Sequence, residues 1–143
     1  MGAAMNNATF SAVVAEYNFT EAGEISLVND QLRFSLSMDG KEFGWVYLWV
    51  ECTDIQYCVV YVGMAGKTLK ARCGQHQNGF IRSITGTSHS RRLRAGLDAG
   101  KRYKLFARKS EIREVLGESA ISMVCAEELA FIRKFRPLWN GGA

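Results

Sequence analysis

The sequence predicts a small α+β domain, in which a three-stranded, mainly antiparallel sheet is flanked by helices. Two apolar runs, residues 45–51 and 57–62, are separated by a short polar connection, which is typical of a β-hairpin. A third apolar run at residues 103–107 has basic residues at both ends and predicts the third strand. Segments with helical character lie between and after these runs, so helices are expected against the sheet.

The first 40 residues are expected to add a β extension to this core. Residues 1–8 carry no clear pattern and are expected to be loose. The Asn29-Asp30 pair is a turn signal between two apolar runs and predicts a hairpin over residues 24–38. The extension could serve recognition, dimerisation or packing. Because the chain has 143 residues, we expect one domain over residues 1–143, with its core at 44–140.

The central hairpin carries one tyrosine on each strand, Tyr47 and Tyr61. Side chains alternate along a strand, so the two tyrosines share a face only if paired residue numbers add up to an even value. A four-residue loop that pairs Cys52 with Tyr57 gives an odd value. The hairpin must therefore have a three- or five-residue loop, such as one pairing Cys52 with Cys58, or contain a bulge.

Four helices are expected after the hairpin. Thr68 lies near the start of the first helix, and the Asn78-Gly79 pair is expected to end it. Ser110 is expected to cap the third helix, with acidic residues following it. The expected helices are residues 68–78, 90–99, 110–116 and 119–135, and residues 85–90 are expected to form a polar linker.

The charge is strongly divided along the chain. Residues 1–66 carry two basic and eight acidic side chains, net −6, and residues 67–143 carry sixteen basic and six acidic, net +10. This asymmetry favours a polyanionic partner for the second half, with an ordinary basic surface as the alternative. The densest basic run is expected to follow a phosphate backbone. It contains Arg91, Arg92, Arg94, Lys101, Arg102, Lys104, Arg108 and Lys109.

The four cysteines are expected to be reduced and mostly buried. An even number of cysteines permits disulfides, but the N-terminus lacks the pattern of a secretory signal. A zinc site formed by Cys73 and His76 with Cys52 and Cys58 is disfavoured by the wide spacing of the first pair. No apolar run approaches the length of a membrane span, so we expect a cytoplasmic protein without membrane contact.

The run YVGMAGKTLKARCGQH, from Tyr61 to His76, holds the most informative candidate site residues. A strand ends near Gly63, and a short turn leads into the first predicted helix. Arg72 and His76 are four residues apart, so they share a face of that helix. A fixed cation and a titratable imidazole beside a tyrosine suit work on a phosphate group.

Together with WVYLWV at residues 45–50 and EELAFIRKFRPLWN at residues 127–140, this run resembles the GIY-YIG nuclease superfamily. The resemblance spans about residues 44–140. Trp45 replaces the glycine of the first half-motif, and Met64 stands where related enzymes often have lysine, a role that Lys67 would fill from one turn later. The residues that match the family pattern are Tyr47, Tyr61, Gly63, Arg72, His76, Glu128 and Asn140.

The resemblance implies a DNA endonuclease that uses one Mg²⁺ or Mn²⁺ ion per active site, held by Glu128, and leaves 5′-phosphate and 3′-hydroxyl ends. Tyr47 and Tyr61 would flank the attacking water, Arg72 would bind the scissile phosphate, and His76 would orient a tyrosine or relay a proton. Gly63 and Asn140 would support the site structurally.

Double-stranded DNA is the expected partner, contacted by Arg91, Arg92, Arg94, Lys101, Arg102 and Lys104. A homodimer would suit a restriction-type or phage-conflict enzyme. The alternatives are a non-catalytic nucleic-acid-binding module on a degenerate fold, and a ribonuclease or toxin nuclease. Taken singly, each site residue also has an ordinary interpretation, such as a core tyrosine or a solvated helix glutamate.

Overall fold

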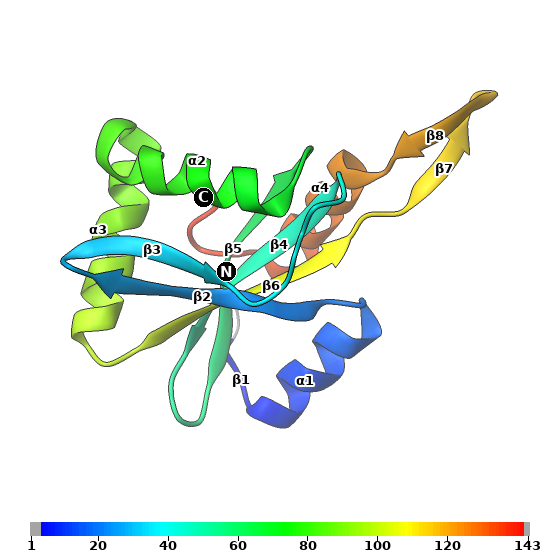
Figure 1. Cartoon of the computed structure of the whole chain (residues 1–143). Helices are drawn as coiled ribbons and strands as arrows, with labels where there is room; N and C mark the ends of the chain where they lie inside the picture. Colours follow the sequence, from blue (N-terminus) through cyan, green and yellow to red (C-terminus); the bar gives the residue numbers. More distant parts are fainter. Residues whose placement is uncertain (1–3, 142–143) are drawn as a thin grey trace.

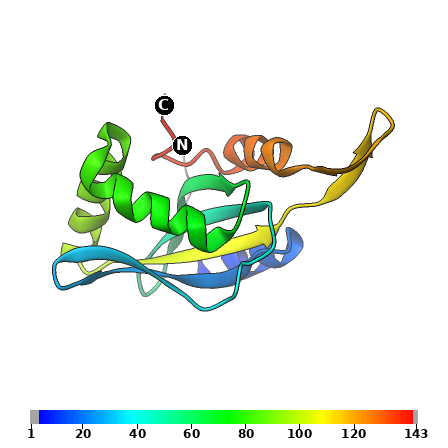
Figure 2. The ribbon, with the colours of Figure 1, turned by 45° about the horizontal axis from the view of Figure 1, so that its top comes forward.

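The computed structural model describes residues 4–141 and shows a twisted antiparallel sheet between two layers of helices (Figures 1 and 2). The sheet has six strands in the order β1-β5-β4-β6-β2-β3, and β7 and β8 form a separate hairpin. The elements are β1 (Ala4–Met5), α1 (Asn7–Glu16), β2 (Thr20–Val28), β3 (Gln31–Leu36), β4 (Trp45–Cys52), β5 (Tyr57–Ala65), α2 (Leu69–Arg82), α3 (Ile84–Asp98), β6 (Arg102–Lys109), β7 (Ile112–Val115), β8 (Glu118–Ser122) and α4 (Val124–Phe135).

The prediction of a small three-stranded sheet is wrong, because the main sheet has six strands. The three predicted strands are present as β4, β5 and β6. The N-terminal hairpin is also present, with Asn29 and Asp30 both at positive φ in its turn, as a two-residue hairpin turn requires. This hairpin is not a separate extension, since β2 pairs with β6 and continues the central sheet. Ala4 and Met5 add β1 at the other edge, and α1 begins at Asn7, so residues 4–8 are not loose.

β4 is the central element, and both of its faces are buried. Trp45, Tyr47 and Trp49 face α2 and α3, where they pack with Leu69, Phe80 and Leu93. Val46, Leu48 and Val50 face the opposite layer, where they pack with Phe10 of α1 and with Val124 and Phe131 of α4. This double burial explains why the β4 sequence is apolar throughout instead of alternating with polar residues.

A β-bulge places both tyrosines on one face of the sheet. The β4–β5 loop has four residues, with Cys52 opposite Tyr57, so the alternative that pairs Cys52 with Cys58 does not occur. The register shifts between Trp49 and Val50 and leaves one additional residue, Val60, in β5. Beyond the bulge Trp49 pairs with Tyr61, and the bulge alternative is therefore confirmed.

The helices α2 and α3 form a closely packed pair that the sequence pattern did not predict. Thr68 caps α2 as expected, since its hydroxyl accepts a hydrogen bond from the amide of Ala71. However, α2 continues through Asn78-Gly79 to Arg82, and the expected linker at 85–90 belongs to α3. A Cβ at Gly86 would lie 2.1 Å from the carbonyl oxygen of Gly79, so the lack of a side chain at Gly86 permits the close approach of α3 to α2.

The segment after β6 forms a projecting hairpin instead of a helix (Figure 1). Leu116 and Gly117 both have positive φ and make a two-residue turn between β7 and β8. The last helix, α4, therefore begins at Val124 and not near residue 119. Among residues 4–141, no helix is long and apolar enough to cross a membrane.

Candidate active site

Tyr47 and Tyr61 come from the two central strands and lie side by side. Their ring centroids are 6.3 Å apart, on the sheet face that α2 covers. Tyr47 is buried, whereas Tyr61 is half-buried and lines a cleft. Burial raises the pKa of both phenols, and the nearby Arg72 opposes this rise. Both hydroxyls are therefore protonated at neutral pH.

Gly63 makes room for the Tyr47 ring. The two residues are directly opposite each other in the β4–β5 ladder. A Cβ at Gly63 would lie 2.4 Å from the hydroxyl oxygen of Tyr47 and 2.5 Å from its Cζ. The glycine of the Tyr61-Val62-Gly63 run is thus required because the phenol of Tyr47 passes directly over the β5 backbone.

His76 holds the hydroxyl of Tyr47 from the buried face of α2. Its Nε2 lies 2.5 Å from the Tyr47 hydroxyl oxygen, and its ring packs at 4.9 Å from Trp49. Burial, with Arg72 and His89 nearby, lowers the pKa of His76 to about 3. The imidazole is therefore neutral at physiological pH and can accept or donate one hydrogen bond at each ring nitrogen.

We predict that the buried His76 makes the protein less stable in mild acid. The unfolded chain binds a proton near the ordinary histidine pKa of about 6.5, whereas the folded chain does so only near pH 3. The contribution of His76 to the free energy of unfolding is therefore retained above about pH 6.5 and is lost as the pH falls toward 3. This histidine contributes up to about 2 kcal/mol to the loss between pH 7 and 5. Urea unfolding of the wild type and His76→Gln at both pH values measures it, and equal pH dependence in the two proteins would contradict the assignment.

Arg72 lies on α2, one turn before His76. Its Nη1 donates a hydrogen bond of 2.9 Å to the side-chain oxygen of Gln75. Arg72 acts electrostatically on Tyr47, Tyr61 and Glu128, lowering the pKa of each. A half-buried guanidinium beside two phenols can bind an anion in the bidentate manner of a phosphate contact.

The adjacent glutamates of α4 have different surroundings. Glu127 forms an ion pair with Arg108, 3.1 Å between Oε1 and Nε, and accepts a 2.9 Å hydrogen bond from the amide of Glu111. Glu128 is half-buried, and within residues 4–141 it takes part in no ion pair. Burial raises the pKa of Glu128, while Arg72 lowers it. Glu128 is also close enough to Tyr61 to raise the pKa of that phenol.

Glu128 is thus the carboxylate next to the tyrosines and Arg72, and it suits a hard divalent cation. Among the described residues, no three His, Cys, Asp or Glu side chains gather as a metal-binding group. All four cysteines are free thiols. A single carboxylate fits Mg²⁺, which commonly takes one or two protein carboxylates and completes its octahedron with water and phosphate oxygens. The residues present are compatible with an ion that binds together with a phosphate.

Lys67 lies in the exposed turn between β5 and α2. It lines a shallow hollow of about 250 Å³ together with Arg72 and Gln75. The turn is anchored by a 3.2 Å hydrogen bond from the amide of Gly44 to the carbonyl of Lys67. The lysine is therefore next to the tyrosine–arginine cluster but on its solvent side.

Asn140 fastens the C-terminal segment to β5. Its side-chain oxygen accepts a 2.9 Å hydrogen bond from the amide of Val62, and its Nδ2 donates one of 2.7 Å to the carbonyl of Val62. The amide of Trp139 also donates to the carbonyl of Val60. The segment thus covers the edge of β5 beside Tyr61.

Replacing Asn140 by alanine removes both hydrogen bonds to Val62. We expect the free energy of unfolding to fall by about 1–3 kcal/mol, since each hydrogen bond contributes about 0.5–1.5 kcal/mol. Thermal unfolding followed by circular dichroism measures the change. Asn140→Asp keeps the acceptor and loses the donor, so it should give an intermediate loss; an unchanged melting temperature in Asn140→Ala would contradict this role.

The six basic residues expected to contact DNA divide into two groups. Arg94, Lys101 and Lys104 form ion pairs with Asp30, Glu51 and Glu21 at 3.3, 3.1 and 3.3 Å. Arg91, Arg92 and Arg102 are exposed and take part in no ion pair among the described residues. Only the second group is immediately available to an external phosphate.

His89 is a site residue to which the sequence analysis assigned no role. It is 3% exposed and packs 4.9 Å from Tyr61 and 5.2 Å from Trp49, measured between ring centroids. The histidine was placed in a polar linker, but it lies on α3. Its spacing to Leu93 and Gly96, which are also buried, is the helical signal that could have revealed this.

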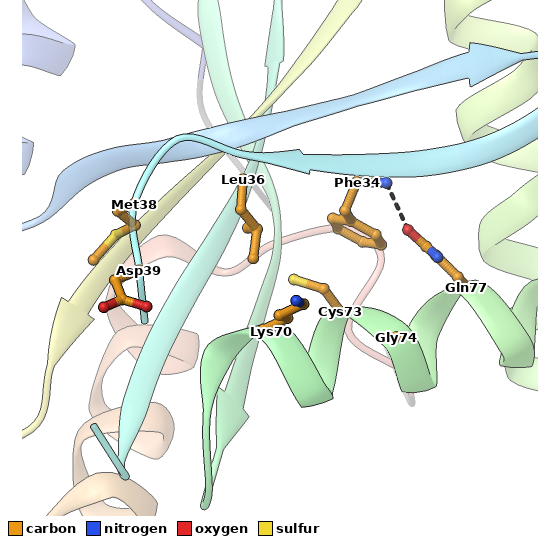
Figure 3. Close-up of a pocket in the computed structure, with 8 residues that line it drawn as sticks. All are labelled: Phe34, Leu36, Met38, Asp39, Lys70, Cys73, Gly74 and Gln77. Carbon is orange, nitrogen blue, oxygen red and sulfur yellow. Dashed lines mark hydrogen bonds between the residues drawn. The ribbon is translucent and has the colours of Figure 1, made fainter. Parts of the chain in front are cut away.

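A larger hollow of about 530 Å³ lies between α2 and β3 (Figure 3). Phe34, Leu36, Met38 and Cys73 line it, and Gln77 accepts a 2.8 Å hydrogen bond from the amide of Phe34. Burial raises the pKa of the Cys73 thiol to about 12, so this thiol is unreactive. By helical periodicity the hollow is on the opposite side of α2 from Arg72 and His76.

Comparisons with known proteins show which structures share this fold. No protein-family model matches the chain, and no curated protein matches it. The structure of a bacteriophage T4 EndoII mutant is similar, with a TM-score of 0.69 and 23% sequence identity over 91% of this chain and 97% of that one. The restriction endonuclease HPY188I, in complex with product DNA, has a TM-score of 0.52 and 16% identity over 97% of this chain and 87% of its own. At these identities the likeness concerns the fold, and the chain has a nuclease-like fold.

Proposed function

We propose that this chain is a metal-dependent DNA endonuclease of the GIY-YIG type, with residues 1–143 forming one nuclease domain. The observation that carries the proposal is the meeting of two phenols, a guanidinium and a carboxylate from β4, β5, α2 and α4. Tyr47 and Tyr61 are 6.3 Å apart, and Arg72 and Glu128 act electrostatically on Tyr61. The likeness to a restriction endonuclease bound to product DNA supports DNA as the partner.

Each side chain has a defined part in the reaction. Arg72 donates hydrogen bonds to two oxygens of the scissile phosphate and stabilises the charge that develops on them. Tyr61, at the cleft, orients the water that attacks phosphorus. Tyr47 is held in place by its hydrogen bond to His76, whose imidazole orients the phenol and, with a pKa of about 3, does not keep a proton. The proton of the attacking water leaves to solvent. The bond from phosphorus to the 3′ oxygen breaks, giving 5′-phosphate and 3′-hydroxyl ends.

Glu128 would hold Mg²⁺ or Mn²⁺, one ion per site. The bound ion would supply Lewis acidity, neutralising phosphate charge and stabilising the leaving oxygen. Because Glu128 is the only carboxylate in the described cluster, the affinity for the ion should be weak in the absence of DNA.

Incubation of supercoiled plasmid with the purified protein tests the proposal. We expect nicked or linear plasmid with Mg²⁺ and intact plasmid when the metal is chelated. Intact plasmid with both Mg²⁺ and Mn²⁺ would overturn the endonuclease assignment. Mapping the ends of a digested random-sequence substrate would then give the cut geometry and any recognition sequence, including whether the enzyme is restriction-type.

A non-catalytic nucleic-acid-binding module is the second candidate. The departures at Trp45 and Met64 favour it, and Trp45 is buried with its indole N–H bonded to the Glu42 carbonyl, so the fold accommodates this change. Retained DNA binding without cutting identifies the module. Preferential cleavage of RNA in the same assay identifies a ribonuclease, including a toxin nuclease.

A homodimer is part of the proposal, because one such site cuts one strand. Large apolar side chains are exposed on the β7–β8 hairpin, which is unusual for a surface without a partner. They are Ile112, Val115, Leu116 and Ile121. Light scattering with size-exclusion chromatography measures the mass, and a monomer at micromolar concentration would contradict the dimer.

A further inference from the structure

We propose that the cleft between Tyr61 and the start of α3 is a second phosphate-binding subsite, which takes the DNA phosphate next to the scissile one. For its substrate this inference rests on the proposed endonuclease function. The cleft has a volume of about 160 Å³ and is continuous with the reaction centre, since Tyr61, Arg72 and His76 line that side of it. Ser83, Thr85, Gly86 and His89 line the side formed by α3.

The α3 side of the cleft is the N-terminus of a 15-residue helix. Ser83 is the N-cap, and its hydroxyl accepts a 2.8 Å hydrogen bond from the amide of Gly86. The amides of Ile84 and Thr85, at the first helical positions, have no carbonyl acceptor within the helix. Such amides, with the partial positive charge of the helix end, bind phosphate readily. The nearby carbonyl of Gly79 is already occupied by the amide and hydroxyl of Ser83.

His89 provides an independent indication of a ligand. It is 3% exposed, and its Nδ1 is buried without a hydrogen-bond partner among the described residues. Buried polar atoms in folded proteins are almost always hydrogen-bonded, so this ring lacks a partner that a ligand could supply. Burial and the nearby Arg92 lower the pKa of His89 to about 4, so the neutral ring carries one N–H donor. A phosphate oxygen in the cleft is a suitable acceptor.

The charges around the cleft favour an anion that continues from the reaction centre. Arg72 lies at one end, and Arg92 is close enough to His89 to lower its pKa. Thr85, His89 and Arg92 are spaced by four and three residues, so they share one face of α3. A DNA strand whose scissile phosphate is bound by Arg72 would place its next phosphate at the helix end and pass on to Arg92.

A carboxylate at the mouth of the cleft tests the subsite without endangering the fold. Thr85 is exposed at the first turn of α3, where an acidic side chain stabilises the helix and repels a phosphate. Thr87→Glu is the control, since Thr87 is exposed on the same helix and does not line the cleft. Because the Thr87 hydroxyl donates a 2.6 Å hydrogen bond to the Ser83 carbonyl, the melting temperatures of both variants are compared with that of the parent protein. Both variants are made in a Glu128→Gln background, so that DNA binding is measured without cleavage.

We expect Thr85→Glu to weaken binding to a short DNA duplex at least tenfold more than Thr87→Glu does. In a plot of log affinity against log salt concentration, the slope should decrease in magnitude by about one, as expected for the loss of one phosphate contact. Equal affinities and equal salt slopes in the two variants would overturn the subsite.

Inorganic phosphate provides a test that is independent of DNA cleavage. In nuclear magnetic resonance spectra of the protein, added phosphate should shift the amide signals of Ile84, Thr85 and Gly86 and the ring signals of His89. The shifts should be absent in Thr85→Glu and present in Thr87→Glu. Intact plasmid together with these shifts would refute the endonuclease and keep the subsite. The subsite would be refuted, and the endonuclease kept, if the protein cleaves plasmid but these signals do not shift at phosphate concentrations that shift the signals of Arg72.

Discussion

Replacing Glu128 by glutamine is expected to reduce plasmid cleavage about a thousandfold, which corresponds to roughly 4 kcal/mol of transition-state stabilisation. Glutamine has nearly the same shape but lacks the charge that would hold a divalent ion beside Tyr61 and Arg72. Because Glu128 forms no ion pair within residues 4–141, its replacement should leave the fold and the DNA affinity largely unchanged. Cleavage rates, measured by the conversion of supercoiled to nicked plasmid, test this expectation.

Glu127→Gln is the matched control, since it makes the same chemical change one residue earlier. It removes the charge that pairs with Arg108 and weakens the hydrogen bond to the Glu111 amide. We expect lower thermal stability, by about 1–3 kcal/mol, with cleavage retained. The opposite pattern, with cleavage lost in Glu127→Gln and kept in Glu128→Gln, would show that Glu127 and not Glu128 holds the metal.

Replacing Gly63 by alanine is expected to destabilise the protein by about 2–3 kcal/mol and to abolish cleavage. The new methyl group would lie 2.4 Å from the Tyr47 hydroxyl, and Tyr47 is 2% exposed and surrounded by packed rings, so the phenol has no space to move. The hydrogen bond to His76 must then distort. Thermal unfolding should show a loss of about 6–12 °C for a chain of this size, and the plasmid assay measures the activity.

Gly66 is the control position for this substitution. It lies three residues later in the turn, its φ is not positive, and a Cβ there would meet no atom within 4 Å. Gly66→Ala should therefore be as stable and as active as the wild type. If Gly63→Ala behaved in the same way as Gly66→Ala, the close contact between Tyr47 and the β5 backbone would be refuted.

The strands could be predicted from sequence because each is a local pattern. The apolar runs of β4, β5 and β6 and the Asn29-Asp30 turn are patterns of this kind. The six-stranded sheet could not be predicted, since the pairing of β2 with β6 joins residues about 80 positions apart. No local pattern specifies such a partner.

The errors in the helices have a similar origin. The Asn78-Gly79 pair predicts a helix end and residues 85–90 predict a linker, but Gly86 permits the close approach of α2 and α3, which depends on tertiary packing. The run at residues 111–122 is too short for the spacing of its apolar residues to distinguish a short helix from a hairpin. For the candidate site, the choice of Glu128 came from the resemblance alone, whereas the different contacts of Glu127 and Glu128 are seen only in the structure.

Because β5 has one additional residue, Tyr47 and Tyr61 meet only when β4 and β5 pair in the correct register. If β5 paired with β4 one position out of phase, Tyr61 would turn to the layer of Phe10 and Phe131, away from Tyr47 and His76. Such a misaligned chain could still bury many apolar groups, but its two phenols would be divided between opposite sides of the molecule. A conformer trapped in that state during folding would lack the pair of tyrosines on which the proposed chemistry depends.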